Sequence, residues 1–137
     1  MPIGNWVKIG GRTWNVRVTE ITEDFSVLYS DNTGRTMEAG APLTLDPLGT
    51  FFGHKVTFAR AKSGADEFDA LFNFLAQPRN KGIPIQIVHN QSTISYNAYV
   101  SSGNRQLQQI DEKKNVVKWD KLQVSFIAIS AQIRPTG

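Results

Sequence analysis

The sequence predicts a mainly β protein with one helix, built as an antiparallel β-barrel or a two-sheet sandwich with a long loop between its early strands. Three observations lead to this prediction. Several short segments alternate between apolar and polar residues, as half-buried strands do. A single segment near the middle carries apolar residues at helical spacing. One long segment, Ser30–Gly53, shows little periodicity although strand-like stretches flank it.

The first strand is expected over Thr13–Ile21, where a tryptophan and two valines share one face. A second alternation covers Phe25–Tyr29. The residues between them, Thr22–Asp24, are typical of a turn, so the two segments are expected to form a hairpin. After the long segment, residues 51–61 alternate again, and Gly53 within them indicates a bulge or a close backbone approach.

One helix is expected within Ser63–Pro78. Ser63 is expected to cap its start, with Asp66 three residues later, and the proline is expected to end it. The apolar stripe consists of Phe68, Leu71, Phe72 and Leu75. A helix this short gains most of its stability by docking, so the stripe is expected to lie against a sheet.

Two more hairpins are expected in the C-terminal half. A turn at His89–Ser92 separates one alternating segment from the next, which runs over residues 94–100. A Gly-Asn turn leads into a further strand, and Asp111–Asn115 forms the turn before the last and most apolar strand. About seven strands result. No repeat, low-complexity tract or linker marks a second unit, so residues 1–137 are expected to form a single domain.

Composition limits the classes of function. The chain has 15 lysines and arginines against 12 acids, and its basic residues stand apart except for Lys113 and Lys114. A nucleic-acid surface is normally a clustered basic stripe. Cysteine is absent, which removes disulfides and thiolate chemistry. No apolar signal segment or membrane span is apparent, so the chain is expected to be soluble, without membrane insertion.

The residues give little support for an enzyme. His54 and His89 are the only histidines, and neither has a neighbour at metal-ligand spacing, so both are expected to be structural or solvated. Acids cluster at Glu20–Asp24 and Asp66–Asp69, where a turn and a helix start explain them. We therefore predict no catalytic, cofactor-binding or metal-binding residue, and no cofactor.

The long segment Ser30–Phe52 is the most distinctive feature. Loops longer than about 12–15 residues without structure of their own are uncommon in compact domains. This segment begins with polar turn residues and then carries apolar side chains that a disordered tract would lack. These are Met37, Leu43, Leu45, Leu48, Phe51 and Phe52. The segment either covers one end of the barrel as a lid or extends to a neighbouring subunit, and we favour extension.

Five stretches carry a family resemblance: NTGRTMEAG (32–40), DPLGTFFGHKVTFA (46–59), DEFDALFNFLAQP (66–78), STISYNAYVSSGNRQL (92–107) and WDKLQVSFIAISAQIRP (119–135). They resemble small tail or baseplate proteins encoded in prophages of Gram-positive bacteria. The order of hairpin, long loop, strand, helix, hairpin and two strands is similar to the tail-tube fold of tailed bacteriophages. The resemblance covers nearly the whole chain.

The resemblance implies a structural virion protein that forms a ring, commonly six-fold, in a tail tube or baseplate hub. Ser30–Phe52 would be an inter-subunit arm, and its candidate contacts are Arg35, Met37, Leu43, Leu45 and Phe51. The implied partners are copies of the chain and neighbouring tail or baseplate proteins. DNA would pass through the lumen without base-specific contacts. The protein would be made in the host bacterial cytoplasm and reside in the virion tail.

The alternative is a small β-barrel binding module that recognises nucleic acid or a carbohydrate on a sheet face. It would use Trp6, Trp119 and the scattered arginines, because aromatic rings and basic groups together bind single strands. Trp14 lies on an apolar strand face and is expected in the core. Salt distinguishes the two hypotheses, since nucleic-acid affinity falls steeply as counterions are released.

Overall fold

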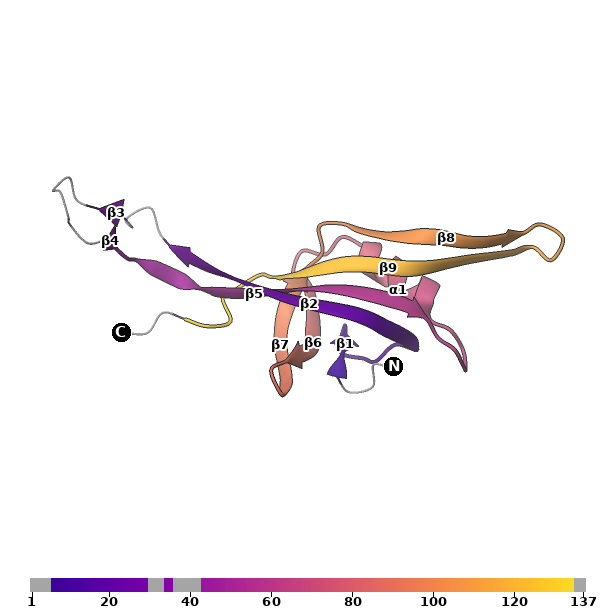
Figure 1. The fold of residues 1–137 in the computed structure, drawn as a ribbon, viewed down its shortest axis with the longest axis horizontal. Helices are drawn as coiled ribbons and strands as arrows, with labels where there is room; N and C mark the ends of the chain where they lie inside the picture. Colours follow the sequence, from indigo (N-terminus) through magenta and orange to yellow (C-terminus); the bar gives the residue numbers. More distant parts are fainter. Residues whose placement is uncertain (1–5, 30–33, 36–42, 135–137) are drawn as a thin grey trace.

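The computed structural model describes residues 6–29, 34–35 and 43–134 (Figure 1). Within these residues the elements are β1 (Lys8–Ile9), β2 (Val16–Tyr29), β3 (Gly34–Arg35), β4 (Leu43–Thr44), β5 (Pro47–Arg60), α1 (Phe68–Ala76), β6 (Ile83–His89), β7 (Ser92–Tyr99), β8 (Gly103–Asp111) and β9 (Val116–Ala128). The prediction of a mainly β protein with one helix is confirmed.

Seven strands form a single antiparallel sheet in the order β1-β6-β7-β9-β5-β2, with β8 paired to β9 beside this path. Between β7 and β9 only two residue pairs connect the sheet, Ala98 with Ala128 and Tyr99 with Ile127. The short strands β1, β6 and β7 therefore run across the direction of the long strands (Figure 1). The sheet is not closed, since β1 and β2 remain its ends, and the predicted closed barrel or two-sheet sandwich is wrong.

The strand β2 is continuous where the sequence predicted a hairpin. Thr22–Asp24 lie inside the strand and pair with Gly53–Lys55 of β5. The register shifts between Val18 and Glu20, which leaves Thr19 as an extra residue. Such a bulge moves the inward face from even-numbered to odd-numbered positions. The residues Thr22–Asp24, which are typical of a turn, therefore continue a strand that is interrupted only by a β-bulge at Thr19.

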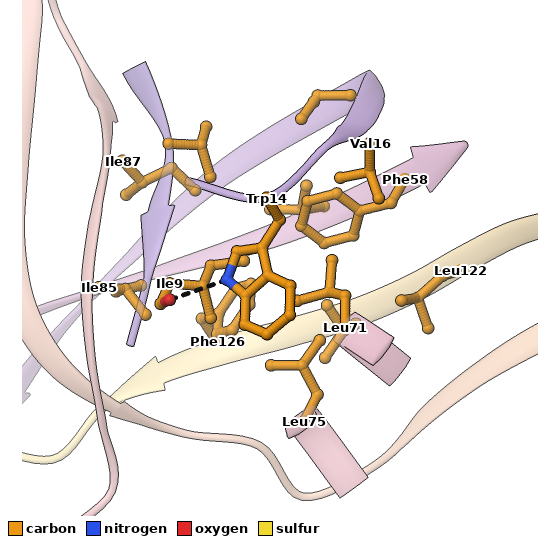
Figure 2. Close-up of a cluster of buried hydrophobic side chains, with 14 of the residues drawn as sticks. Ile9, Trp14, Val16, Phe58, Leu71, Leu75, Ile85, Ile87, Leu122 and Phe126 are labelled. Atoms are coloured by element: carbon orange, nitrogen blue, oxygen red, sulfur yellow. Dashed lines mark hydrogen bonds between the residues drawn. The ribbon is translucent and has the colours of Figure 1, made fainter. Parts of the chain in front are cut away.

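The core lies between the long strands, the crossing strands and the helix (Figure 2). Phe58, Leu122 and Phe126 come from β5 and β9, and all are almost completely buried. Trp14 lies among them as predicted, and its indole Nε1–H donates to the Ile9 carbonyl oxygen at 2.9 Å. That bond satisfies the one polar atom of a large buried ring.

The helix α1 is shorter than predicted. It begins at Phe68, after Glu67 at the N-cap position, and neither Ser63 nor any other side chain caps it there. Instead, the Asp66 carboxylate accepts the backbone N–H groups of Phe68 and Ala61. The apolar stripe is confirmed, because Phe68, Leu71 and Leu75 are buried. Docking of this stripe places α1 against β5 and β9.

Two hairpins project from opposite ends of the molecule (Figure 1). At one end β2 and β5 continue beyond the core toward β3 and β4. We call this end the arm: residues 24–29 of β2, residues 47–52 of β5, and the small sheet of β3 and β4. At the other end β8 and β9 form the hairpin end, Leu107–Lys118. The core lies between the two.

Candidate functional site

The arm is a ribbon of β2 and β5, bridged at Thr50 by Ile133 near the C-terminus, and it leaves large apolar side chains in solvent. Aromatic and β-branched residues favour its extended backbone. Phe25 is 68% exposed and Leu48 is 55% exposed. The other exposed apolar residues of the arm and its connection are Val27, Leu28, Tyr29 and Leu45. Phe25, Val27 and Tyr29 alternate along β2 and therefore share one face, and an exposed apolar patch favours an interaction surface.

The arm contains most of the residues predicted as inter-subunit contacts. Arg35 and Leu43 are cross-strand partners in β3 and β4. Leu45 is exposed, whereas Phe51 is half-buried in β5 and pairs with Ser26. Met37 lies outside the described residues. The expectation of an irregular segment is wrong for residues 34–35, 43–44 and 47–50, which lie in strands, whereas Phe51 and Phe52 lie in β5 as the alternation from residue 51 predicted.

The hairpin end carries a second exposed apolar group that sequence reasoning missed. Leu107, Ile110 and Val117 are exposed there, Ile110 at 58%. The register shifts between Leu107 and Gln109, so Gln108 is an extra residue and Leu107 and Ile110 lie on the same face. Because Leu107 and Ile110 are three residues apart, a search for strict apolar–polar alternation does not place them on one face. A leucine and an isoleucine in an otherwise polar strand were the available signal.

A buried polar cluster lies at the root of the arm. His54 of β5 is 1% exposed. Its Nε2 atom is 2.7 Å from Glu23 Oε2, and its Nδ1 atom is 2.7 Å from the Tyr96 hydroxyl. Nδ1 of His89 is also 2.7 Å from the same Glu23 oxygen. We call these four residues, from β2, β5, β6 and β7, the root cluster.

One assignment of protons gives each hydrogen bond of the root cluster a donor and an acceptor. The Glu23 carboxylate accepts N–H groups from both histidines, and the remaining ring nitrogen of His54 accepts the Tyr96 O–H. Burial lowers the pKa of His54, and the neighbouring Glu23 offsets this only in part. Burial acts to raise the pKa of Glu23, but the bonds from His89 and His54 outweigh it and leave that pKa below its usual value.

Burial also raises the pKa of Tyr96, which therefore keeps its proton at neutral pH. Both ring nitrogens of His54 are occupied by these contacts. The root cluster thus links strands instead of exposing a nucleophile. Both histidines belong to this network, and the expectation that they are structural or solvated stays a prediction. In the part of the chain that the structure describes, no histidine and acidic side chains are arranged to hold a metal ion.

The groups named for a binding module are not gathered on one surface. Trp6 is 50% exposed, whereas Trp119 is partly buried and packs under Arg105. Most arginines are engaged within the chain: Arg12 with Glu67 and Trp14, Arg17 with the Arg60 carbonyl, Arg60 with Asp66, Arg79 with Phe74, and Arg105 with Asp69, Phe72 and Trp119. Binding a phosphate backbone through them would require breaking these contacts.

An apolar groove of about 400 Å³ runs between β2 and the end of β6. It is lined by Trp6, Val7, Val18, Ile21, Val88, Asn90 and Gln91. The groove marks the place where the open sheet brings its β2 end near β6 without pairing them. It is the surface on which Trp6 would meet a ligand.

Comparisons with known proteins add no relative. Neither a scan against protein-family models nor a search of curated proteins gives a match. Among the described residues, no helix has the length and apolar character needed to cross a membrane. The functional argument therefore depends on the geometry of the chain itself.

Proposed function

We propose that this chain is a non-catalytic structural protein that associates with copies of itself to form a ring, hexameric by analogy, in a phage tail tube or baseplate hub. The observation that carries the proposal is the pair of projecting hairpins with exposed apolar side chains. Phe25 and Leu48 lie on one, and Ile110 and Val117 on the other. Apolar groups held away from the core of one copy are stabilised when another copy covers them.

The two projecting ends differ in sequence and face opposite directions (Figure 1). A contact that uses one end of each copy is heterologous, and repeated heterologous contacts close into a ring when the rotation per subunit fits. Among the described residues, β1 and β2 are the ends of the sheet, and this favours the same outcome, because an open sheet edge is a template for further strands. Neighbouring tail or baseplate proteins would cover the remaining ring faces. The virion tail would then be its location, after synthesis in the bacterial cytoplasm.

Removal of the arm connection tests the proposal. Tyr29 and Pro47 are cross-strand partners, so residues 30–46 can be replaced by a two-residue turn without disturbing the ribbon below them. We expect a folded chain that sediments as a monomer at concentrations where the intact chain forms larger species. Trp6→Ser is the matched control, since it removes an exposed apolar side chain in the groove. Equal sedimentation of the shortened and intact chains would contradict the proposal.

A second candidate function is a binding module, and the exposed Trp6 in its apolar groove is the observation that favours it. Titration with a single-stranded oligonucleotide and with oligosaccharides, monitored by tryptophan fluorescence, separates the candidates. Binding that Trp6→Ser abolishes would support the module, and for the oligonucleotide it should weaken steeply with salt. Self-association through apolar ends should persist as salt is raised.

A further inference from the structure

The root cluster lies where the arm leaves the core. Glu23 and His54 are cross-strand partners in β2 and β5, directly next to the pair Asp24 and Gly53 with which the arm side of the ribbon begins. His89 and Tyr96 approach them from the crossing strands β6 and β7. The cluster therefore joins the arm-bearing strands to the crossing strands at one point.

We propose that Glu23, His54, His89 and Tyr96 form a proton-sensitive clasp, which holds the arm against β6 and β7 at neutral pH and releases it in mild acid. The clasp lies within one chain, so this inference does not depend on the proposed assembly.

Aromatic rings are also in contact at the clasp. Besides the three hydrogen bonds, the Phe52 ring meets the His89 ring edge-on, with centroids 4.8 Å apart. The Tyr96 and His54 rings are stacked, with centroids 5.7 Å apart. Loss of the hydrogen bonds would leave these ring contacts between the arm root and the strands β6 and β7. The β5 side of the arm keeps a second attachment, because Thr50 exchanges backbone hydrogen bonds with Gln132 and Ile133, and the Gln132 side chain bonds the backbone of Phe52.

Protonation conflicts with the observed pattern of donors and acceptors. A proton added to His54 would go to Nδ1, the atom that accepts the Tyr96 O–H at neutral pH. The Tyr96 hydroxyl would then need a new acceptor inside a buried site. His89 shares the Glu23 oxygen with His54, and its proximity also disfavours a positive charge on His54. Like charges this close repel each other, and a protonated His54 would have lost its hydration.

The groups that face His54 come from every neighbouring strand. Glu23 and Asp24 lie on β2, His89 on β6 and Tyr96 on β7. On β9 the register partner is Phe126, which carries no charge. Glu23 and Asp24 favour the protonated ring and burial disfavours it, and the balance favours the neutral form.

The sign of the pH effect follows from this balance. Because the folded-state pKa of His54 lies below its ordinary value near 6.5, the open cluster binds more protons than the closed one. The contribution of His54 to stability is therefore complete above pH 6.5 and falls as the pH drops below it. Glu23 adds a second loss at lower pH, below its ordinary value of 4.5, because its folded-state pKa is also lowered.

Hydrogen exchange on the intact chain tests the clasp, at a concentration where sedimentation shows a monomer. Protection factors correct for the intrinsic pH dependence of exchange. Between pH 7.5 and 5.5 we expect protection at the arm root, in residues 22–24 and 53–54, to fall about tenfold, while protection in α1 and in residues 122–126 of β9 stays the same. Unchanged protection at the arm root, or an equal loss throughout the sheet, would overturn the proposal.

The variant His54→Gln removes the titrating ring and keeps an acceptor and a donor. Its arm protection should be the same at pH 5.5 and 7.5. Glu20→Gln is the charge control, since it removes an exposed acid of β2 three residues from Glu23 and should respond to acid as the wild type does.

Nitrogen-15 NMR of histidine in the wild type decides the matter even if the variant fails to fold. We expect His54 in the Nε2–H tautomer at pH 7.5, with a protonation midpoint that coincides with the loss of arm protection. The Nδ1–H tautomer, or a midpoint separate from that loss, would overturn the clasp.

Discussion

Gly82 lies directly before β6, where its backbone comes too close to Ala98 of β7 for a side chain to fit. Its φ is +76°, and a Cβ added to it would lie 2.5 Å from the Ala98 carbonyl oxygen. Gly11 has a similar φ of +79°, but a Cβ there would meet nothing within 4 Å. Substitution of Gly11 therefore measures backbone strain alone, and substitution of Gly82 measures strain together with steric conflict.

Gly82→Ala should lower the free energy of unfolding by roughly 2–5 kcal/mol, because strain and overpacking add. Gly11→Ala should cost only the strain, about 1–2 kcal/mol. Urea unfolding followed by circular dichroism measures both. Equal costs for the two variants would show that the close contact at Gly82 is relaxed at little expense.

Tyr96→Phe removes the donor to His54 and leaves a buried ring nitrogen without its partner. We expect a loss of about 1–3 kcal/mol in the free energy of unfolding at pH 7.5. Tyr99→Phe is the control, since that side chain is exposed and should change stability by less than about 0.5 kcal/mol. Similar values for the two variants would mean that the hydroxyl of Tyr96 adds little.

For single residues, the sequence predicted the surroundings of a side chain better than the residues that the side chain contacts. A histidine inside an alternating apolar segment indicated a structural role for His54, and Gly53 indicated a close approach. An added Cβ at Gly53 would indeed lie 2.7 Å from Asp24 Oδ1. The root cluster could not be predicted, because its members lie 31, 42 and 66 positions apart in hydrogen-bonded pairs. Only strand order brings them together.

Among the elements, α1 depends on its docked stripe. Leu71→Ala should destabilise the protein by about 2–5 kcal/mol, since the side chain is completely buried and its loss leaves a cavity. Asn73→Ala, on the exposed side of the same helix, should change stability by less than about 0.5 kcal/mol. Thermal and urea unfolding check both values. A small effect at Leu71 would contradict docking as the source of helix stability.

The helix and the hairpin of β6 and β7 were predictable because their periodicity is uninterrupted, whereas β8 carries two register shifts and begins at Gly103, inside the predicted Gly-Asn turn. The strand β2 was not predictable, because the bulge at Thr19 reverses the alternation inside one strand. A bulge and a turn leave the same trace in the apolar pattern of a single sequence. Pairing with β5 across Thr22–Asp24 resolved the ambiguity, and that partner is distant in the sequence.

For the whole molecule, both projecting ends should matter for association. Phe25→Ser with Leu48→Ser alters the arm, and Ile110→Ser with Val117→Ser alters the hairpin end. All four side chains are exposed, so each double variant should keep its fold and lose apolar contact area with a neighbour. Analytical ultracentrifugation should show weaker association for both. Full association of either variant would remove that end from the proposed interface.

The sequence alone could not show that the predicted barrel or sandwich is an open sheet. Alternating strands fit open and closed sheets equally well, and the difference lies in how β7 meets β9 at only two residue pairs. A short junction lets the crossing strands turn away, so β2 and β6 approach without pairing.

The uninterrupted course of β2 from the core into the arm makes the ribbon a lever. Tyr29 lies six residues beyond Glu23 on that strand, a span of about 20 Å. A rotation of about 10° at Glu23 would therefore displace Tyr29 by about 3–4 Å, which is comparable to the spacing of neighbouring strands. In the proposed assembly, small adjustments among these four side chains would therefore change where the far end of the ribbon meets a neighbouring copy.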